Sequence, residues 1–193
     1  MSVRQDGARG VLHRDRAVLV VVDLQEKLLS AIHEKERVLE SGLLLIRAAR
    51  ELELPLVLTT QYEKGLGPTV GEVLAEAPGA RPVDKVAFGC FGSEEFRARL
   101  ATLAGRDQLL VAGIESHICV AQTALGALDQ GYDVHLAADA VGARRPGDRE
   151  VGLRRMERAG AVLSSAEMAI YELLGRSDGA AFKRLLPYLR QDR

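Results

Sequence analysis

Cysteine is scarce in this sequence, and long apolar runs are missing from it. The chain has only two cysteines, Cys90 and Cys119, which are too few for a disulfide framework, so both thiols are expected to be free in a reducing cytosol. The longest apolar run, residues 17–22, is far shorter than the roughly 18 residues that a spanning helix needs. Residues 1–16 are polar and show no apolar core of a secretory signal. These absences predict a cytoplasmic protein without a membrane segment.

An excess of charge of one sign is also missing. The formal net charge is −1, from 26 Lys and Arg against 27 Asp and Glu, so the chain lacks the positive field that attracts nucleic acid or an anionic membrane. The arginines stand among acidic residues, and no basic stripe with interleaved aromatic residues is present. The expected partner is therefore a small molecule, and neither nucleic acid nor a membrane.

Short apolar runs alternate with longer amphipathic segments along the chain. Continuous runs rich in Val and Leu are typical of parallel strands that are buried on both faces. The expected strands cover residues 17–22, 56–60, 83–87, 108–112 and 134–138, with a weaker one at 161–163. Expected helices cover residues 34–53, 93–103, 118–130, 148–159 and 180–189, and Ser164 with Glu167 forms a predicted capping box for a further helix.

Alternating strands and helices predict right-handed βαβ units. The expected fold class is therefore α/β: a three-layer, doubly wound and mostly parallel sheet with helices on both faces. We expect one domain over residues 1–193, with residues 1–15 as a loose N-terminal extension. Ligands bind such sheets beyond the carboxyl ends of the strands, so the residues that follow each apolar run are the candidates for a site.

Three chemically distinctive residues occupy such positions. Asp23 follows the first run, Lys85 stands within the run 83–87, and Cys119 begins a predicted helix, where the helix dipole stabilises a thiolate. A carboxylate can take the thiol proton and an ammonium favours the thiolate, so together they would make a cysteine nucleophile near neutral pH. Each residue alone also has a structural explanation: a helix cap for Asp23, a chain reaching the surface for Lys85, and a small buried apolar group for Cys119.

The residues around these three resemble the isochorismatase-like cysteine hydrolase superfamily. The resemblance is carried by VVVDLQ at 20–25, DKVAF at 84–88, GIESHICV at 113–120 followed by QTA at 122–124, GYDV at 131–134, and ADA at 138–140. The segment TQYEKGLGPTV at 60–70 is similar to one branch, the isochorismatase domain-containing hydrolases. The motifs occur in the right order, and the resemblance runs from about residue 16 to 189.

This resemblance implies a mechanism. Asp23 would be the general base, Lys85 would hold the carboxylate and thiolate together, and Cys119 would attack a carbonyl carbon to form a thioester acyl-enzyme. The substrate would be an amide or a related C–N compound. The backbone N–H groups of Glu115 and Cys119 would form the oxyanion hole, next to a non-proline cis peptide between Ile114 and Glu115. Relatives assemble into dimers, tetramers or rings, so a homo-oligomer is expected.

Several other residues are candidates for the substrate pocket. They are Leu28, Gln61, Tyr62, Phe88 and His117. Core packing is the default interpretation of Leu28 and Phe88. Gln61 and Tyr62 are equally typical of a polar turn, and His117 of a loop histidine bonded to nearby backbone. Cys90 has no charged neighbour in the sequence, and we interpret it as structural or incidental.

Departures from the superfamily narrow the expected chemistry. Nicotinamidases of the superfamily carry an Asp and two His metal ligands after the second strand, whereas residues 59–69 contain neither, and the four histidines do not cluster. We therefore expect no metal and no cofactor. True isochorismatases resemble this fold but lack a cysteine at the nucleophile position, so Cys119 argues against their reaction. The alternative function is non-catalytic: metabolite binding, or thiol redox sensing on the same fold.

Overall fold

The computed structural model describes residues 10–190; residues 1–9 and 191–193 lie outside the described part. Its centre is a six-stranded sheet in the order β3-β2-β1-β4-β5-β6, and every paired neighbour is parallel. The strands are β1 (Ala17–Val22), β2 (Leu56–Gln61), β3 (Val83–Lys85), β4 (Gln108–Ile114), β5 (Asp133–Gly142) and β6 (Val162–Ser164). This is the predicted α/β sheet, and the chain reverses its direction of winding between β1 and β4.

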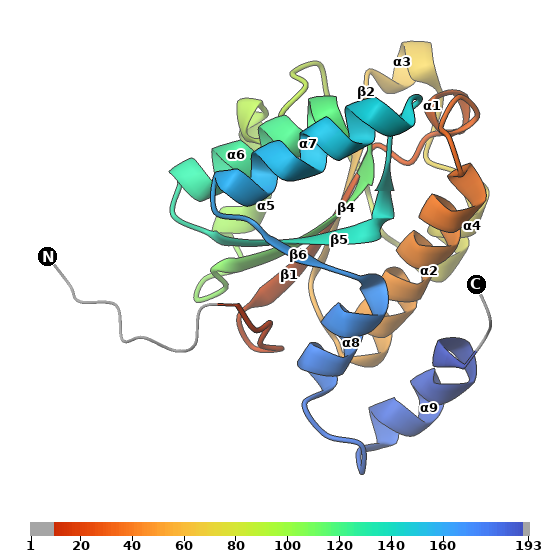
Figure 1. Cartoon of the computed structure of the whole chain (residues 1–193), viewed down its shortest axis with the longest axis vertical. Coiled ribbons are helices and arrows are strands. Elements are labelled where there is room, and N and C mark those ends of the chain that lie inside the picture. The colour runs from red at the N-terminus through yellow and green to blue at the C-terminus, as the bar shows by residue number, and fades with distance from the viewer. Residues whose placement is uncertain (1–9, 191–193) are drawn as a thin grey trace, which may run out of the picture.

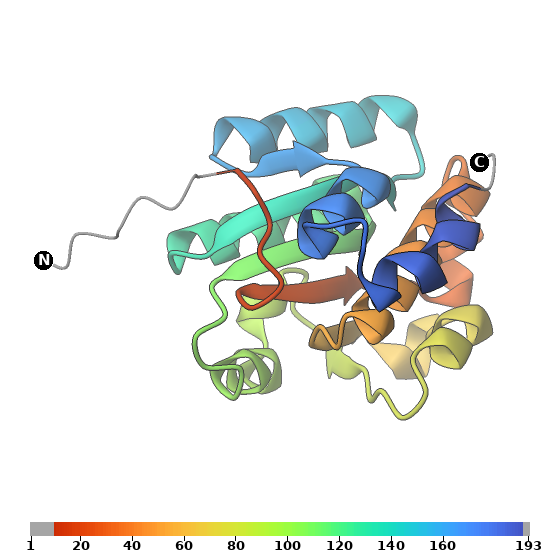
Figure 2. The same cartoon turned by 90° about the horizontal axis from the view of Figure 1, so that it is seen from below.

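Helices cover both faces of the sheet (Figures 1 and 2). The main ones are α2 (Lys35–Glu51), α5 (Glu94–Ala101), α6 (Ala121–Asp129), α7 (Pro146–Arg158), α8 (Ala166–Leu174) and α9 (Ala180–Leu189). Short helical segments that the sequence analysis did not predict lie in the connections: α1 (Glu26–Leu29), α3 (Glu63–Leu66), α4 (Gly71–Glu76), the 3₁₀ turn η1 (Cys90–Gly92) and the π-helical turn η2 (Ser116–Val120). A three-layer arrangement results.

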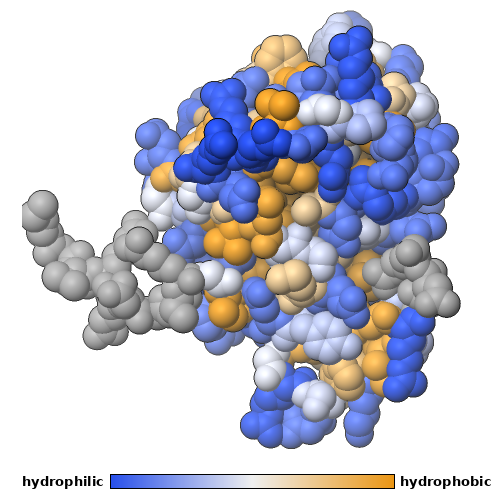
Figure 3. Space-filling view, in the orientation of Figure 1, coloured by the Kyte–Doolittle hydropathy of each residue, from blue (hydrophilic) through white to orange (hydrophobic). Residues whose placement is uncertain are grey.

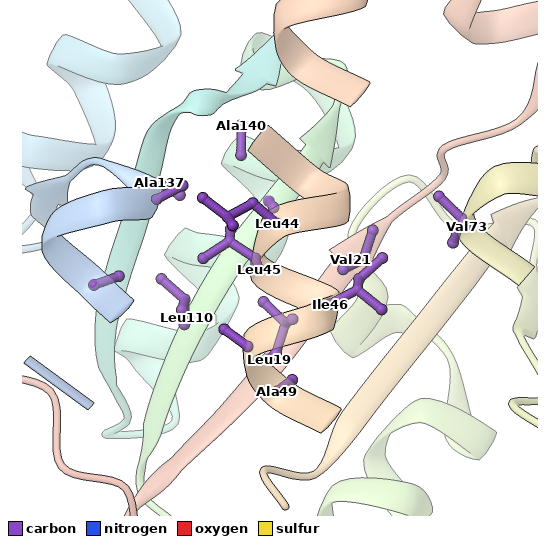
Figure 4. Packing of buried hydrophobic residues seen from close by; sticks show 14 of the residues in the cluster. Leu19, Val21, Leu44, Leu45, Ile46, Ala49, Val73, Leu110, Ala137 and Ala140 are labelled. Atoms are coloured by element: carbon purple, nitrogen blue, oxygen red, sulfur yellow. The ribbon is translucent and has the colours of Figure 1, made fainter. Parts of the chain in front are cut away.

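The apolar core is split in two by the sheet because successive side chains of a strand point to opposite faces. In β1, Leu19 and Val21 pack with α2, whereas Val18 and Val20 pack on the other face. We call these the α2-side core and the α6-side core. Figure 4 shows the α2-side core, where Leu44, Leu45 and Ile46 of α2 lie over the strands. All six residues of β1 are buried, which explains why this strand reads as one apolar run.

Two local predictions need correction. The cap of α8 is Ser165, whose hydroxyl accepts a hydrogen bond from Met168 N at 3.1 Å; Ser164 ends β6, and its hydroxyl donates to Ser165 O instead. The predicted capping box of Ser164 and Glu167 is therefore one residue out of register.

The second correction concerns residues 1–15, which were expected to be loose. Residues 1–9 lie outside the described part, but Leu12 is buried in the α2-side core and its N–H donates to Glu172 Oε2 at 2.8 Å. His13 N donates to Gln108 Oε1 at 2.7 Å. These contacts tie the chain before β1 to the body of the molecule.

The molecular surface shows hydrophilic side chains over the upper part of the face seen in Figure 3, with an apolar area near its centre. Within residues 10–190, no helix is long and apolar enough to cross a membrane.

Candidate active site

Asp23 is presented by an unusual turn at the end of β1. Its φ is +52°, a left-handed conformation that Asp tolerates better than most side chains. Its N–H donates to Thr59 O at 3.2 Å, and its own carbonyl accepts from Gln25 N at 2.8 Å. The carboxylate is fully buried. The turn thus holds a charged group beyond the carboxyl end of the strand.

Lys85 supplies the opposite charge. It ends β3 and lies in register with Gln61 of β2. Its Nζ donates to Asp23 Oδ2 at 2.7 Å, and the two side chains are 1% and 0% exposed. Burial of an ion pair is costly unless its remaining polar atoms are also bonded. The sequence analysis expected these two residues to meet, and the structure brings them together.

Two residues of β2 complete the bonding of this pair. Thr59 Oγ1 donates to Asp23 Oδ1 at 2.7 Å, and Gln61 Oε1 accepts from Lys85 Nζ at 2.8 Å. Each carboxylate oxygen therefore has a donor, and the ammonium has two acceptors. Sequence reasoning missed Thr59 and placed Gln61 only at the pocket; the available signal was the polar TTQ ending of an otherwise apolar run.

Cys119 lies beside this pair, inside the turn η2 between β4 and α6. Burial raises the pKa of its thiol to about 12; the Asp23 charge and a hydrogen bond to Asp23 act in the same direction, and the Lys85 charge opposes them. The thiol therefore rests protonated at neutral pH, next to a carboxylate that can accept its proton. The sequence analysis placed Cys119 at a helix start; the structure places it in the π turn η2 that precedes α6, with its side chain buried.

Cys90 is the second thiol near the same charges. It is 0% exposed; its N–H donates to Thr123 Oγ1 at 3.0 Å, and its Sγ lies 3.9 Å from Thr59 Oγ1. Burial raises its pKa to about 11, with smaller effects from Lys85 and Asp23. The sequence analysis interpreted Cys90 as structural or incidental, and its closeness to the site was not foreseen, because it lies in an irregular segment after β3.

The loop before Cys119 carries the predicted oxyanion residues. The peptide bond between Ile114 and Glu115 is cis. The Glu115 carboxylate accepts from the backbone N and the Nε of Arg144, at 3.0 and 3.1 Å. His117 Nε2 lies 3.9 Å from Asp148 Oδ2, and its buried Nδ1 has no hydrogen-bond partner among residues 10–190. The mostly buried Glu115 side chain is thus bound by Arg144, an exposed residue that follows β5.

The remaining pocket candidates lie in two different parts of the structure. Tyr62 and Phe88 are 50% and 56% exposed and follow β2 and β3, close in sequence to Gln61 and Lys85. Leu28 instead packs against the α2-side core, whereas Cys119 belongs to the α6-side core. Leu28 therefore fits its core-packing interpretation.

Metal ligation finds no support in the described side chains. Residues 10–190 contain no group of three His, Cys, Asp or Glu side chains that could hold a metal ion. The acidic and basic groups of the site are paired with each other instead. What the arrangement can do is transfer a proton between a buried thiol and a buried carboxylate.

Comparison with known proteins finds a matching family and similar relatives. The family description "Isochorismatase domain" matches residues 17–168. The secreted isochorismatase effector Isc1 of Phytophthora sojae is 35% identical over 178 residues, covering 91% of this chain and 85% of that protein. Isochorismatase domain-containing protein 2 of Danio rerio is 35% identical over 176 residues, covering 91% of this chain and 88% of that protein.

Solved structures show the same fold. A structure described as MAR1 ribonuclease from Caenorhabditis elegans has a TM-score of 0.88 at 34% identity, covering 94% of this chain and 93% of that chain. YcaC from Pseudomonas aeruginosa, with hexane-2,5-diol and covalent acrylamide, has a TM-score of 0.87 at 31% identity, covering 93% and 92%. YcaC from Escherichia coli, described as an octameric hydrolase of unknown specificity, has a TM-score of 0.87 at 31% identity, covering 93% and 91%.

Proposed function

This chain belongs to the isochorismatase family, and on that premise we propose that it is a metal-independent cysteine hydrolase of small-molecule amides or related C–N compounds. The observation that carries the proposal is the buried ion pair of Asp23 and Lys85, 2.7 Å apart, beside the Cys119 thiol. A buried ion pair contributes little to stability for its cost, whereas a carboxylate next to a buried thiol is what a general base requires.

The proposed reaction begins with the protonated thiol. Asp23 takes the proton from Cys119 Sγ as the sulfur attacks the substrate carbonyl carbon, so no free thiolate has to accumulate. The carbonyl oxygen becomes an oxyanion, which the backbone N–H groups of Glu115 and Cys119 stabilise; one such donor is typically worth about 3 kcal/mol. The amine leaves with the proton held by Asp23, and a thioester remains. Asp23 then takes a proton from the water molecule that attacks the thioester and passes it to the departing Cys119 sulfur, which releases the acid and restores the thiol and the carboxylate.

Lys85 has an electrostatic role in this scheme. Its ammonium lowers the pKa of the Cys119 thiol, against the raising effects of burial and of Asp23. As the proton moves from sulfur to carboxylate, the negative charge moves from Asp23 to sulfur, and the ammonium stabilises it at either place. Only the negative charge therefore changes position, and it stays next to the ammonium within the buried site.

The choice of Cys119 over Cys90 rests on the Asp23 carboxylate, whose charge is the second-largest influence on the pKa of Cys119 after burial and a lesser one for Cys90. Cys90 is instead held by the hydroxyl groups of Thr59 and Thr123. A precedent for an electrophile bound covalently in this fold is the P. aeruginosa YcaC structure with covalent acrylamide, since acrylamide alkylates thiols.

The two cysteines form a matched pair for the test. Purified protein is screened against amides, ureas and esters of small acids, with release of the amine or alcohol as the readout. Cys119→Ser should lower kcat by at least about a thousandfold, as expected for loss of a nucleophile, whereas Cys90→Ser should keep activity within a few-fold. Loss of turnover in Cys90→Ser with full turnover in Cys119→Ser would overturn the assignment.

A role as a thiol redox sensor is the competing function. Sulfenic acid forms from a thiolate that peroxide can reach. Both thiols are buried and have raised pKa values, about 12 for Cys119 and about 11 for Cys90. These values disfavour sensing and leave hydrolysis as the function that the site supports best.

The substrate, assembly and location are parts of the same proposal. The near-zero net charge of −1 favours a small molecule over RNA, although one structural neighbour is named a ribonuclease; the screen therefore includes an RNA oligonucleotide. We propose a homo-oligomer because the E. coli YcaC relative is octameric and because several large apolar side chains are exposed, among them Val86, Val151 and Met168. Light scattering tests this.

Two buried free thiols fit a reducing compartment, so we propose a cytoplasmic location. The P. sojae relative is named as secreted, which makes cell fractionation the deciding measurement. Recovery of the protein outside the cytoplasm would contradict this part of the proposal.

A further inference from the structure

The Gln61 side chain makes two hydrogen bonds that leave its amide one orientation. Gln61 is 8% exposed; its Oε1 accepts from Lys85 Nζ at 2.8 Å, and its Nε2 donates to Val86 O at 2.9 Å. An ammonium can only donate and a carbonyl oxygen can only accept. Exchange of the amide oxygen and nitrogen would therefore set donor against donor and acceptor against acceptor. The amide is locked with its oxygen toward the ammonium.

The lock on Gln61 constrains the direction of the Lys85 ammonium. An ammonium has three N–H donors in tetrahedral directions. Asp23 Oδ2 and Gln61 Oε1 accept two of them, at 2.7 and 2.8 Å. Once two directions are taken, the third is determined. Without Gln61, rotation about the last C–N bond and bending of the lysine chain would move the positive charge relative to Asp23.

A second glutamine holds the backbone of Gln61. Gln25 is fully buried; its Oε1 accepts from Gln61 N at 2.7 Å, and its Nε2 donates to Gln61 O at 3.2 Å and to Gly67 O at 2.5 Å. One amide thus clamps both polar groups of the Gln61 backbone. Because Gln25 N also donates to Asp23 O at 2.8 Å, the clamp and the proposed base come from the same turn.

From these contacts we infer that Gln61, held by Gln25, is a positioning residue that aims the Lys85 ammonium at the charge shared by Asp23 and Cys119. This inference rests on the proposed function of the same site. A neutral amide suits the task better than a carboxylate would. It accepts the N–H of Lys85 but adds no negative charge that would compete with Asp23 or oppose ionisation of Cys119.

The test measures alkylation of Cys119 by iodoacetamide as a function of pH, followed by peptide mass spectrometry. The variants are Gln61→Leu, which removes the acceptor, and Gln61→Glu, which keeps an acceptor but adds charge. Both should alkylate about tenfold more slowly than wild type at each pH between 7 and 9, which corresponds to a shift of about one pH unit in the profile. Once a substrate is found, kcat should fall with little change in KM.

Two controls keep the outcome interpretable. Gln130→Leu changes an exposed glutamine at the far end of α6 and should leave the profile unchanged. If Gln61→Leu does not fold, Gln61→Met decides the matter, because it also removes the acceptor for Lys85 Nζ without adding a charge. A role in structure alone would lower the melting temperature of the Gln61 variants without moving the pH profile.

The outcomes separate the two proposals. Folded Gln61 variants that alkylate at the wild-type rate and pH would overturn the positioning role. Failure of wild-type protein to turn over any amide, ester or urea in a Cys119-dependent way would instead count against the hydrolase, while the alkylation profile would still decide the role of Gln61.

Discussion

Replacement of Lys85 by methionine tests the central electrostatic claim. The substitution keeps much of the side-chain volume and removes the positive charge. It leaves the Asp23 carboxylate buried at 0% exposure, with the Thr59 hydroxyl at 2.7 Å as a donor. A carboxylate in that position has lost its strongest partner and has no access to water.

The size of the loss follows from the distance between the charges. At 2.7 Å between Nζ and Oδ2 and an effective dielectric constant of 20, the direct attraction is about 6 kcal/mol, which is an upper bound. Measured losses on removing one partner of a buried pair are about 3–5 kcal/mol. We therefore expect Lys85→Met to lower the free energy of unfolding by about 3–5 kcal/mol at pH 7.5.

Urea denaturation followed by circular dichroism measures this loss. The double variant Asp23→Asn/Lys85→Met should be more stable than Lys85→Met alone, since no isolated charge remains. Arg14→Met is the exposed control: its ion pair with Glu53 spans 3.5 Å with side chains 47% and 87% exposed, so a loss below about 1 kcal/mol is expected.

Two results would refute this reasoning. One is a Lys85→Met protein within 1 kcal/mol of wild type at neutral pH. The other is a double variant that is no more stable than the single one. Either would mean that water or another group solvates the carboxylate in the folded protein.

Three further predictions concern the scaffold. Gly113→Ala should lower the free energy of unfolding by about 3 kcal/mol or more in denaturant, because its Cβ would lie 2.0 Å from Val22 O and its φ is +116°. The control Gly147→Ala, where a Cβ meets nothing within 4 Å, should be neutral or slightly stabilising. Equal losses in the two variants would contradict the argument. Burial lowers the pKa of His135, so the unfolded chain binds a proton at this residue more readily, and stability should fall as the pH drops below about 6.5. His135→Leu should reduce that fall between pH 7.5 and 5.5. An unchanged fall would show that His135 is not its cause. Ser165→Ala should lower the free energy of unfolding by about 1 kcal/mol through loss of the α8 cap, and Ser164→Ala should lower it by less. A larger loss for Ser164→Ala in thermal melts would favour the predicted capping box instead.

The strands were the most predictable part of the fold. β1 was predicted at its observed bounds because all six of its residues are buried and apolar and a charged residue follows directly. β5 proved longer than predicted, reaching Gly142, because it continues through Asp139. That carboxylate looks like a strand end in sequence, but it accepts from Ala166 N and Ser41 Oγ, so the strand passes it with its polar atoms bonded.

The site was predictable only in part. Asp23 and Lys85 stand out because a charge next to or inside an apolar run is expensive. Thr59 carries only the weaker signal of a polar ending to an apolar run, and Gln25 carries none, because their hydrogen bonds exist only once β1 and β2 lie side by side. The burial that raises the pKa of Cys119 was also beyond the sequence, because it depends on how the turn η2 packs against the sheet.

The close approach at Gly113 has a consequence for how this protein can change during evolution. Where β4 passes β1, an added carbon atom would occupy the position of the Val22 backbone, one residue before Asp23. The distance between Asp23 and the segment that leads to Cys119 is thus set by direct contact between the backbones of β1 and β4. We therefore expect this spacing to persist while the loops beyond the strand ends vary, because a methyl group at position 113 would push β4 away from the residue before Asp23.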